Sequence, residues 1–113
     1  MDFVVDRKTW FRGKGSDESR LLRADGMRCC IGFVGQQCGV PDSSMLQHSD
    51  IQAMRNAGKD VTRFPYWMSN KEINFEIGKA YEFNDDEEIS NEERENRLSD
   101  LFAKHGDTIT FVD

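Results

Sequence analysis

The fold of this chain depends most on the stretch CCIGFVGQQCG, residues Cys29–Gly39. Cys30, Val34 and Cys38 recur at positions i, i+4 and i+8, which is the spacing of one helix face. Gly39 follows the last of them, where a glycine commonly ends a helix. The stretch therefore predicts a helix over 29–38, and its apolar composition predicts that this helix is the buried centre of the domain.

Two more glycines, Gly32 and Gly35, lie inside this predicted helix. Each costs about 1 kcal/mol relative to alanine in a helix interior. A core helix that carries this cost twice predicts that neighbouring segments approach it more closely than a side chain would allow.

Short elements are predicted before this helix. Phe3–Val5 has the composition of a strand, and Asp6 is a suitable N-cap for a helix over Arg7–Arg12 that ends at a glycine. Gly13–Ser19 then predicts an exposed loop, and Ala24–Gly26 predicts a turn.

Two short helices are predicted after it, near 43–47 and near 50–57. Asp42 and Ser49 are their expected N-caps, and Gly58 closes the second one.

The middle of the chain is more ambiguous. Val61–Met68 predicts an aromatic loop, and Ser69–Glu72 has the form of a capping box that opens a helix. The apolar residues of 73–83 follow helical spacing, but the alternation at 73–77 also fits a strand. Both interpretations of this segment stay open.

The clearest predicted element is a helix that opens with the capping box Ser90–Glu93. Leu98, Leu101 and Phe102 fall on one face, and Gly106 ends the helix.

The last segment, Thr108–Val112, alternates like a strand and is expected to pair with Phe3–Val5, which would bring the termini together. The predicted fold is α+β, one domain over 1–113. Four or five short helices pack on a small sheet that joins the N- and C-terminal strands.

Composition indicates a folded intracellular protein. The chain has 113 residues, of which 37% are hydrophobic, and its eight Phe, two Trp and two Tyr supply large buried surfaces. No apolar stretch approaches the roughly 20 residues that span a bilayer. An acidic N-terminus and three cysteines without paired spacing predict neither secretion nor disulfides, so we expect a cytoplasmic protein.

The charge is concentrated in the C-terminal part of the chain. The net charge is −6, and residues 71–113 carry five Lys/Arg against thirteen Asp/Glu. Such a surface repels phosphate backbones, so we predict no direct nucleic-acid binding.

Several side chains raise the question of a metal ion or a nucleophile. The potential ligands are Cys29, Cys30, Cys38, His48 and His105. Their spacing lacks the paired pattern of a structural zinc site, so we predict core packing of the cysteines and no metal or cofactor. Cys29 or Cys30 beside Arg28 could still act as a nucleophile if a histidine lay within reach.

Two loop motifs resemble known ion-binding loops but lack residues that such loops require. The acidic run from Asn84 resembles a calcium loop, but its sixth position is Ile89 instead of glycine, and a helix start explains the same acids. Gly13–Ser16 suggests a phosphate loop but lacks the full pattern, so we predict a surface loop there.

Two segments that are expected to be exposed could bind a partner protein. The predicted acidic surface lies within 85–95 and comprises Asp85, Asp86, Glu87, Glu88 and Glu92. The predicted apolar anchor comprises Phe64, Tyr66 and Trp67. A solvated helix start and core packing, respectively, are the simpler explanations of the same residues.

Several motifs resemble a group of small proteins encoded by phages and prophages. In the N-terminal half they are Trp10–Gly13, Leu21–Leu22 and Arg28–Phe33, and in the C-terminal half Phe83–Asp86, Ser90–Glu95 and Leu101–Gly106. The resemblance leaves about 45–80 unmatched. It implies a bacterial cytoplasm during infection or lysogeny and an accessory role, and it assigns no function to any residue.

We therefore predict a non-enzymatic accessory protein that binds a host or phage protein through the acidic surface; whether binding inhibits that protein stays open. A small cysteine-dependent enzyme that uses Cys29 or Cys30 is the alternative, and a self-associating structural protein is a third.

Overall fold

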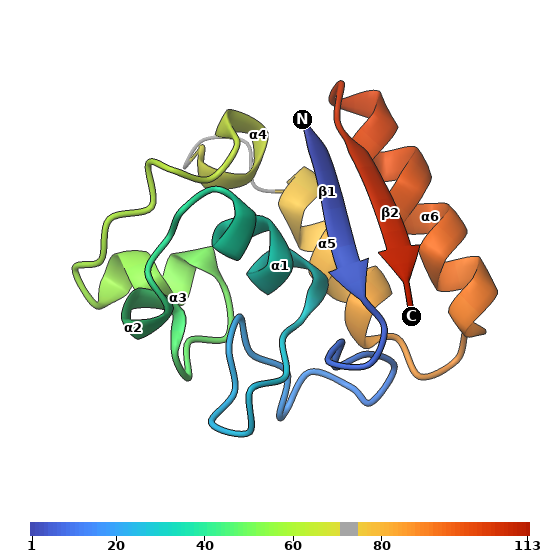
Figure 1. The fold of residues 1–113 in the computed structure, drawn as a ribbon, viewed down its shortest axis with the longest axis horizontal. Coiled ribbons are helices and arrows are strands. Elements are labelled where there is room, and N and C mark those ends of the chain that lie inside the picture. Colours follow the sequence, from blue (N-terminus) through green and yellow to red (C-terminus); the bar gives the residue numbers. More distant parts are fainter. Residues whose placement is uncertain (71–74) are drawn as a thin grey trace.

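The computed structural model describes residues 1–70 and 75–113, which form an α+β fold as predicted (Figure 1). The strands are β1 (Asp2–Asp6) and β2 (Thr108–Val112). The helices are α1 (Cys30–Gln37), α2 (Asp42–Met45), α3 (Ile51–Asn56), α4 (Tyr66–Ser69), α5 (Phe75–Asp85) and α6 (Asn91–Lys104). The described part of the chain thus has six helices, where four or five were expected. Among these residues, no helix is long and apolar enough to cross a membrane.

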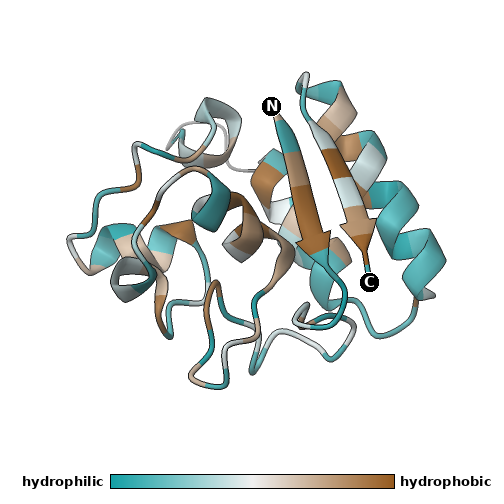
Figure 2. Ribbon diagram, in the orientation of Figure 1, coloured by the Kyte–Doolittle hydropathy of each residue, from teal (hydrophilic) through white to brown (hydrophobic). Residues whose placement is uncertain are grey.

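The predicted pairing of the terminal strands is confirmed. β1 and β2 form a two-stranded parallel sheet in which Asp2 pairs with Thr108 and Asp6 with Val112 (Figure 1). Phe3 and other inward residues of the sheet are buried against α1 and α6. Figure 2 shows mainly hydrophilic residues along α6, in keeping with a helix that buries only one narrow face.

The outer edge of β1 is closed by a side chain. Gln37, the last residue of α1, accepts a hydrogen bond from Val4 N at 2.8 Å and donates one to Val4 O at 2.6 Å. The amide of Gln37 therefore takes the place of a neighbouring strand and satisfies backbone groups that an edge strand leaves unpaired.

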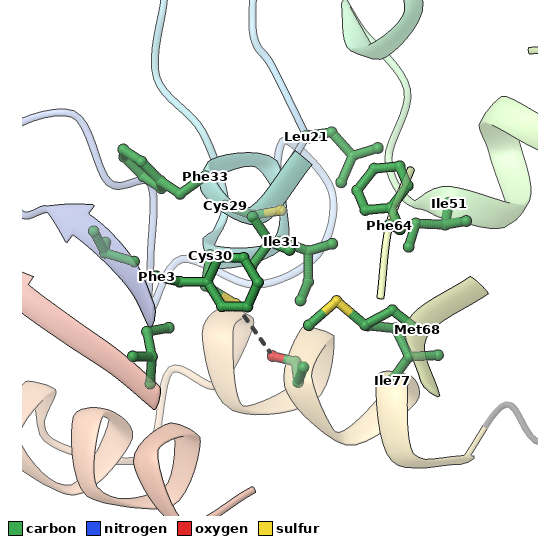
Figure 3. Close-up of a cluster of buried hydrophobic side chains, with 14 of the residues drawn as sticks. Phe3, Leu21, Cys29, Cys30, Ile31, Phe33, Ile51, Phe64, Met68 and Ile77 are labelled. Atoms are coloured by element: carbon green, nitrogen blue, oxygen red, sulfur yellow. Dashed lines mark hydrogen bonds between the residues drawn. The ribbon is translucent and has the colours of Figure 1, made fainter. Parts of the chain in front are cut away.

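α1 is the buried centre of the molecule, as its spacing predicts. Figure 3 shows apolar side chains from four other elements gathered around it, among them Phe3, Ile51, Met68 and Ile77. A Cβ atom added at Gly32 would lie 1.9 Å from the backbone oxygen of Leu21, so the predicted close approach occurs there.

The helix predicted over Arg7–Arg12 does not form. Asp6 does accept a hydrogen bond from Lys8 N, but the chain makes only one turn before Trp10 enters an isolated parallel bridge with Arg28. Phe11 N donates to Arg28 O at 2.7 Å. Burial of two consecutive aromatic residues requires an extended backbone here, and it outweighs the local preference for a helix.

The two predicted N-caps beyond α1 are each displaced by one residue. Pro41 occupies the N-cap position of α2, and the Asp42 carboxylate instead pairs with Arg28 at 2.8 Å. In α3 the cap is Asp50, whose carboxylate accepts a hydrogen bond from Ala53 N at 2.7 Å, and not Ser49. A carboxylate and a hydroxyl are nearly equivalent caps, so the sequence did not distinguish the two neighbours.

The segment from 61 to 85 combines confirmed and corrected predictions. The aromatic loop extends only to Pro65, because the one-turn helix α4 follows. The predicted capping box Ser69–Glu72 and the first residues of 73–83 fall partly outside the described residues. From Phe75 onward the chain is helical, so the strand alternative is wrong for that part.

α6 confirms the C-terminal prediction. The Ser90 hydroxyl accepts a hydrogen bond from Glu93 N at 3.1 Å, and Leu98, Leu101 and Phe102 are buried. Gly106 follows the helix with a φ of 81°, a conformation that favours glycine.

Candidate functional site

The C-terminal end of α5 is fixed by one buried amide. The Oδ1 atom of Asn84 accepts hydrogen bonds from Trp10 Nε1 at 2.7 Å and from Cys30 N at 2.9 Å. Its Nδ2 atom donates to Phe11 O at 3.0 Å. Asn84 is 0% exposed, so this amide joins the N-terminal segment, α1 and α5 inside the protein.

A buried arginine organises the acidic stretch that follows. Arg94, on the second turn of α6, is 2% exposed. Its guanidinium donates hydrogen bonds to four backbone oxygens, those of Phe83 (2.6 Å), Asn84 (3.3 Å), Asp86 (2.8 Å) and Ile89 (3.1 Å). Burial lowers the pKa of Arg94 from its ordinary value. The backbone carbonyls at the end of α5 and in the connection to α6 therefore all point to one side chain, that of Arg94.

The N-terminal loop packs against the same connection. Gly13 N donates to Asn84 O, and Gly15 N donates to Asp85 O, both at 2.8 Å. Gly13 has a φ of 68°, and a Cβ atom there would lie 2.7 Å from a terminal nitrogen of Arg94. Glycine at this position is required both by the backbone conformation and by the closeness of the arginine.

An open depression of about 560 Å³ lies where these two segments meet. We call it the acidic depression; it is lined by Gly15, Ser16, Tyr81, Glu82, Asp85, Asp86, Glu87 and Glu88. Five carboxylates thus line one hollow. None of them forms an ion pair with a described lysine, arginine or histidine.

The five carboxylates differ in how firmly they are held. Asp85 is half-buried, and burial raises its pKa, although hydrogen bonds from Asn84 and Ser19 act in the opposite direction. The Oδ1 atom of Asp86 accepts a hydrogen bond from Glu88 N at 2.8 Å. Glu82, Glu87 and Glu88 are exposed. The depression thus combines two acids held by burial or hydrogen bonds, Asp85 and Asp86, with three exposed carboxylates at its rim.

Two features of the sequence-predicted surface are not part of this depression. Glu92 is exposed on the first turn of α6 but does not line it. The calcium-loop arrangement is not formed either, since the amide of Asn84, its first position, is buried and hydrogen-bonded, and the carbonyl of Ser90, its seventh, accepts a helical hydrogen bond from Arg94 N at 2.9 Å. Within the described residues, no group of three or more His, Cys, Asp or Glu side chains is arranged to hold a metal ion.

The aromatic anchor predicted at 64–67 is not one surface. Phe64 is 3% exposed and packs in the core over Gly35, so its assignment to a binding surface is wrong. Trp67 is half-buried, stacks on His105 at 4.2 Å between ring centres and donates to Asp107 Oδ2 at 2.9 Å. Tyr66 is 78% exposed. None of the three lines the acidic depression.

The two adjacent cysteines are core residues. Cys29 is 1% exposed, and burial raises its pKa to about 12. Burial likewise raises the pKa of Cys30, whose sulfur lies 3.9 Å from Ala80 O (Figure 3). A catalytic thiol needs the opposite, a lowered pKa and access to substrate. The geometry therefore opposes the cysteine-enzyme alternative.

Sequence reasoning missed both residues that build this site. Arg94 precedes Leu98 by four positions and Leu101 by seven, so helical spacing alone places it on the buried face of α6. An arginine at such a position is a detectable signal, because arginine is rarely buried without specific partners. For Asn84 no local signal exists, since the buried partners that its amide joins, Trp10, Phe11 and Cys30, lie 54 or more positions away in the chain.

No protein-family model, curated protein or solved structure matches this chain.

Proposed function

We propose that this protein is a non-enzymatic accessory protein, encoded by a phage or prophage, that binds a basic segment of a host or phage protein in the acidic depression. One observation carries this proposal. The backbone of the acidic connection is fixed by Asn84 and Arg94, and the five carboxylates of the depression form no ion pair among the described residues, although the buried charge of Arg94 attracts Asp85 and Asp86.

This arrangement favours binding over a merely solvated surface. Like charges crowded into one hollow repel one another, and a lysine- or arginine-rich segment relieves that repulsion. Because the backbone is already ordered by two buried side chains, little conformational entropy is lost when the partner binds. The net charge of −6 also attracts basic partners at long range and repels nucleic acids.

Inhibition is a consequence of the same geometry. A basic segment that many proteins use to contact nucleic acids or acidic partners is covered once it lies in the depression. The proposal therefore includes inhibition of the partner wherever that segment is the one the partner needs.

The experiment compares two triple variants with the same change in net charge. Glu82→Lys, Glu87→Lys and Glu88→Lys reverse three exposed acids at the rim of the depression. Asp17→Lys, Glu92→Lys and Asp100→Lys form the matched control, because these acids are exposed and lie outside the depression.

Each tagged protein is used to capture partners from a bacterial lysate, and the purified partner is then titrated at low and high salt. We expect one stoichiometric partner that the control retains and the rim variant loses, with weaker binding at high salt. Equal binding by the rim variant would remove the depression from the proposal. Equal loss in both variants would indicate a nonspecific effect of net charge and would also contradict it.

A further inference from the structure

A second depression, of opposite charge, is lined by residues of the same N-terminal loop. It has a volume of about 230 Å³ and is lined by Trp10, Phe11, Arg12, Lys14, Met27 and Asn91. Its lining includes two cations and no acidic residue. Lys14 lines this basic depression and the next residue, Gly15, lines the acidic one, so the two hollows adjoin. A cationic hollow is unexpected in a protein with a net charge of −6.

Arg12 is held rigidly in this depression. Its Nη1 atom donates to the backbone oxygens of Arg7 at 3.1 Å and of Trp10 at 3.3 Å. The guanidinium carbon lies 4.6 Å from the centre of the Trp10 ring. A planar cation fixed by two carbonyls and an aromatic face has already lost the rotamer freedom that ligand binding would otherwise cost.

The charge of Arg12 is not matched by a carboxylate. Within the described residues Arg12 forms no ion pair. Glu95 attracts it, but the two oxygens of Glu95 already accept hydrogen bonds from Arg7 Nε at 3.0 Å and Nη2 at 2.7 Å. Burial and the charge of Arg7 both lower the pKa of Arg12. An anion beside Arg12 would compensate for this desolvation and repulsion.

Two further groups supply donors to the same hollow. Lys14 is exposed, with its Nζ atom 5.7 Å from the centre of the Phe11 ring. Asn91 is the first residue of α6 and brings a side-chain amide. Lysine, arginine and asparagine donors around one small hollow are the groups that bind oxyanions in proteins.

We propose that the basic depression is a binding site for a small dianionic oxyanion of the phosphate monoester class. The Nη1 atom of Arg12 is engaged by two carbonyls and its Nε atom is buried, so its Nη2 atom is the donor left for a phosphate oxygen. Lys14 supplies the second positive charge, and a dianion balances both. At about 230 Å³ the hollow has room for a phosphate and the first atoms of the group that carries it. Side chains build this site, and no phosphate-loop pattern at Gly13–Ser16 is needed for it. The proposal goes beyond the function proposed above and does not depend on it.

The test is a nuclear magnetic resonance titration of the whole protein at constant ionic strength. Inorganic phosphate and, separately, O-phosphoserine replace chloride, and the amide signals of Trp10–Lys14 and Asn91 are followed. The indole signal of Trp67 is the internal reference, since that residue lies outside the depression. We expect saturable shifts in the first group only. Tighter binding of O-phosphoserine would identify a phosphorylated side chain as the occupant, and equal binding would identify free phosphate.

Lys14→Gln is the decisive variant, because this exposed side chain can be replaced without disturbing the core. We expect it to weaken phosphate binding roughly tenfold or more, as the loss of one charge-assisted contact does. Lys59→Gln removes the same charge from an exposed position outside the depression and is expected to bind like the wild type. Shifts that do not saturate, or equal weakening in both variants, would overturn the proposal. The triple variant of the acidic rim retains phosphate binding if this site is real, even if partner capture fails.

Discussion

At Asn84 one amide side chain satisfies two buried donors and one buried acceptor from segments that are distant in the chain. Asn84→Ala would leave the Trp10 indole N–H and the Cys30 N–H without an acceptor, and an unpaired buried donor costs about 1–3 kcal/mol. We expect the free energy of unfolding, measured by urea denaturation, to fall by about 3 kcal/mol or more. Asn96→Ala, at an exposed position of α6, is the control and should have almost no effect. A similar small effect for both variants would contradict the role assigned to Asn84.

The buried thiols give the protein a specific sensitivity to alkali. The folded state holds the pKa of Cys29 at about 12 and also raises that of Cys30, whereas a thiol in an unfolded chain ionises near about pH 8.5. Above that pH the unfolded state binds fewer protons than the native state, so stability falls as pH rises. Below it this contribution is fully present.

We therefore expect the free energy of unfolding to decrease between about pH 9 and pH 10, by up to about 1.4 kcal/mol per pH unit for each thiol. The range ends there because Tyr81, whose pKa burial also raises, ionises in the unfolded chain near about pH 10. A Cys29→Ala, Cys30→Ala variant should show a shallower slope over the same range. An unchanged slope would mean that other groups cause the loss.

Among the elements, α1 and α5 each contain a glycine in the helix interior, and replacing it with alanine should have opposite effects on stability in the two helices. At Gly32 an added Cβ atom would meet the Leu21 backbone oxygen at 1.9 Å, whereas at Gly78 in α5 nothing lies within 4 Å. Gly32→Ala should therefore destabilise the protein by about 3 kcal/mol or more, because backbone must move. Gly78→Ala should stabilise it by about 1 kcal/mol, the difference in helix propensity. Thermal unfolding monitored by circular dichroism measures both effects. A loss of stability in Gly78→Ala would contradict the open space around Gly78.

At the scale of the whole molecule, the parallel sheet is the contact that joins the two ends of the chain. β1 and β2 pair although about a hundred residues separate them, and Phe3 of β1 packs edge-on against Phe102 of α6 with ring centres 6.0 Å apart. Removal of 108–113 would leave the ladder of β1 unpaired and uncover the part of α6 on which β2 packs. We expect the truncated chain to lose the cooperative thermal transition. Removal of Asp113 alone takes away only an exposed ion pair with Arg7 and should leave the transition unchanged; a cooperative transition in the longer truncation would show that the helices fold without the sheet.

The sequence by itself determined the features whose interacting groups lie within a few residues of one another. The spacing around Val34 predicted α1, the capping box at Ser90 predicted α6, and the glycines at 39 and 106 ended both helices as expected. These signals are reliable because periodicity and capping are local, so the groups that interact are also neighbours in the chain. The α+β class and the pairing of the terminal strands followed from them.

Only the tertiary structure decided the rest. Arg7–Arg12 has a suitable cap, yet it makes only one turn before Trp10 enters its bridge with Arg28. Local preferences differ by less than about 1 kcal/mol per residue, whereas burying an aromatic side chain gains about 1.5–3 kcal/mol. Phe64 and Tyr66 are two positions apart, but one is buried and the other exposed. Asn84 and Arg94 became the centre of the site because unpaired backbone groups from distant segments met there, and buried polar groups must find partners wherever the fold brings them.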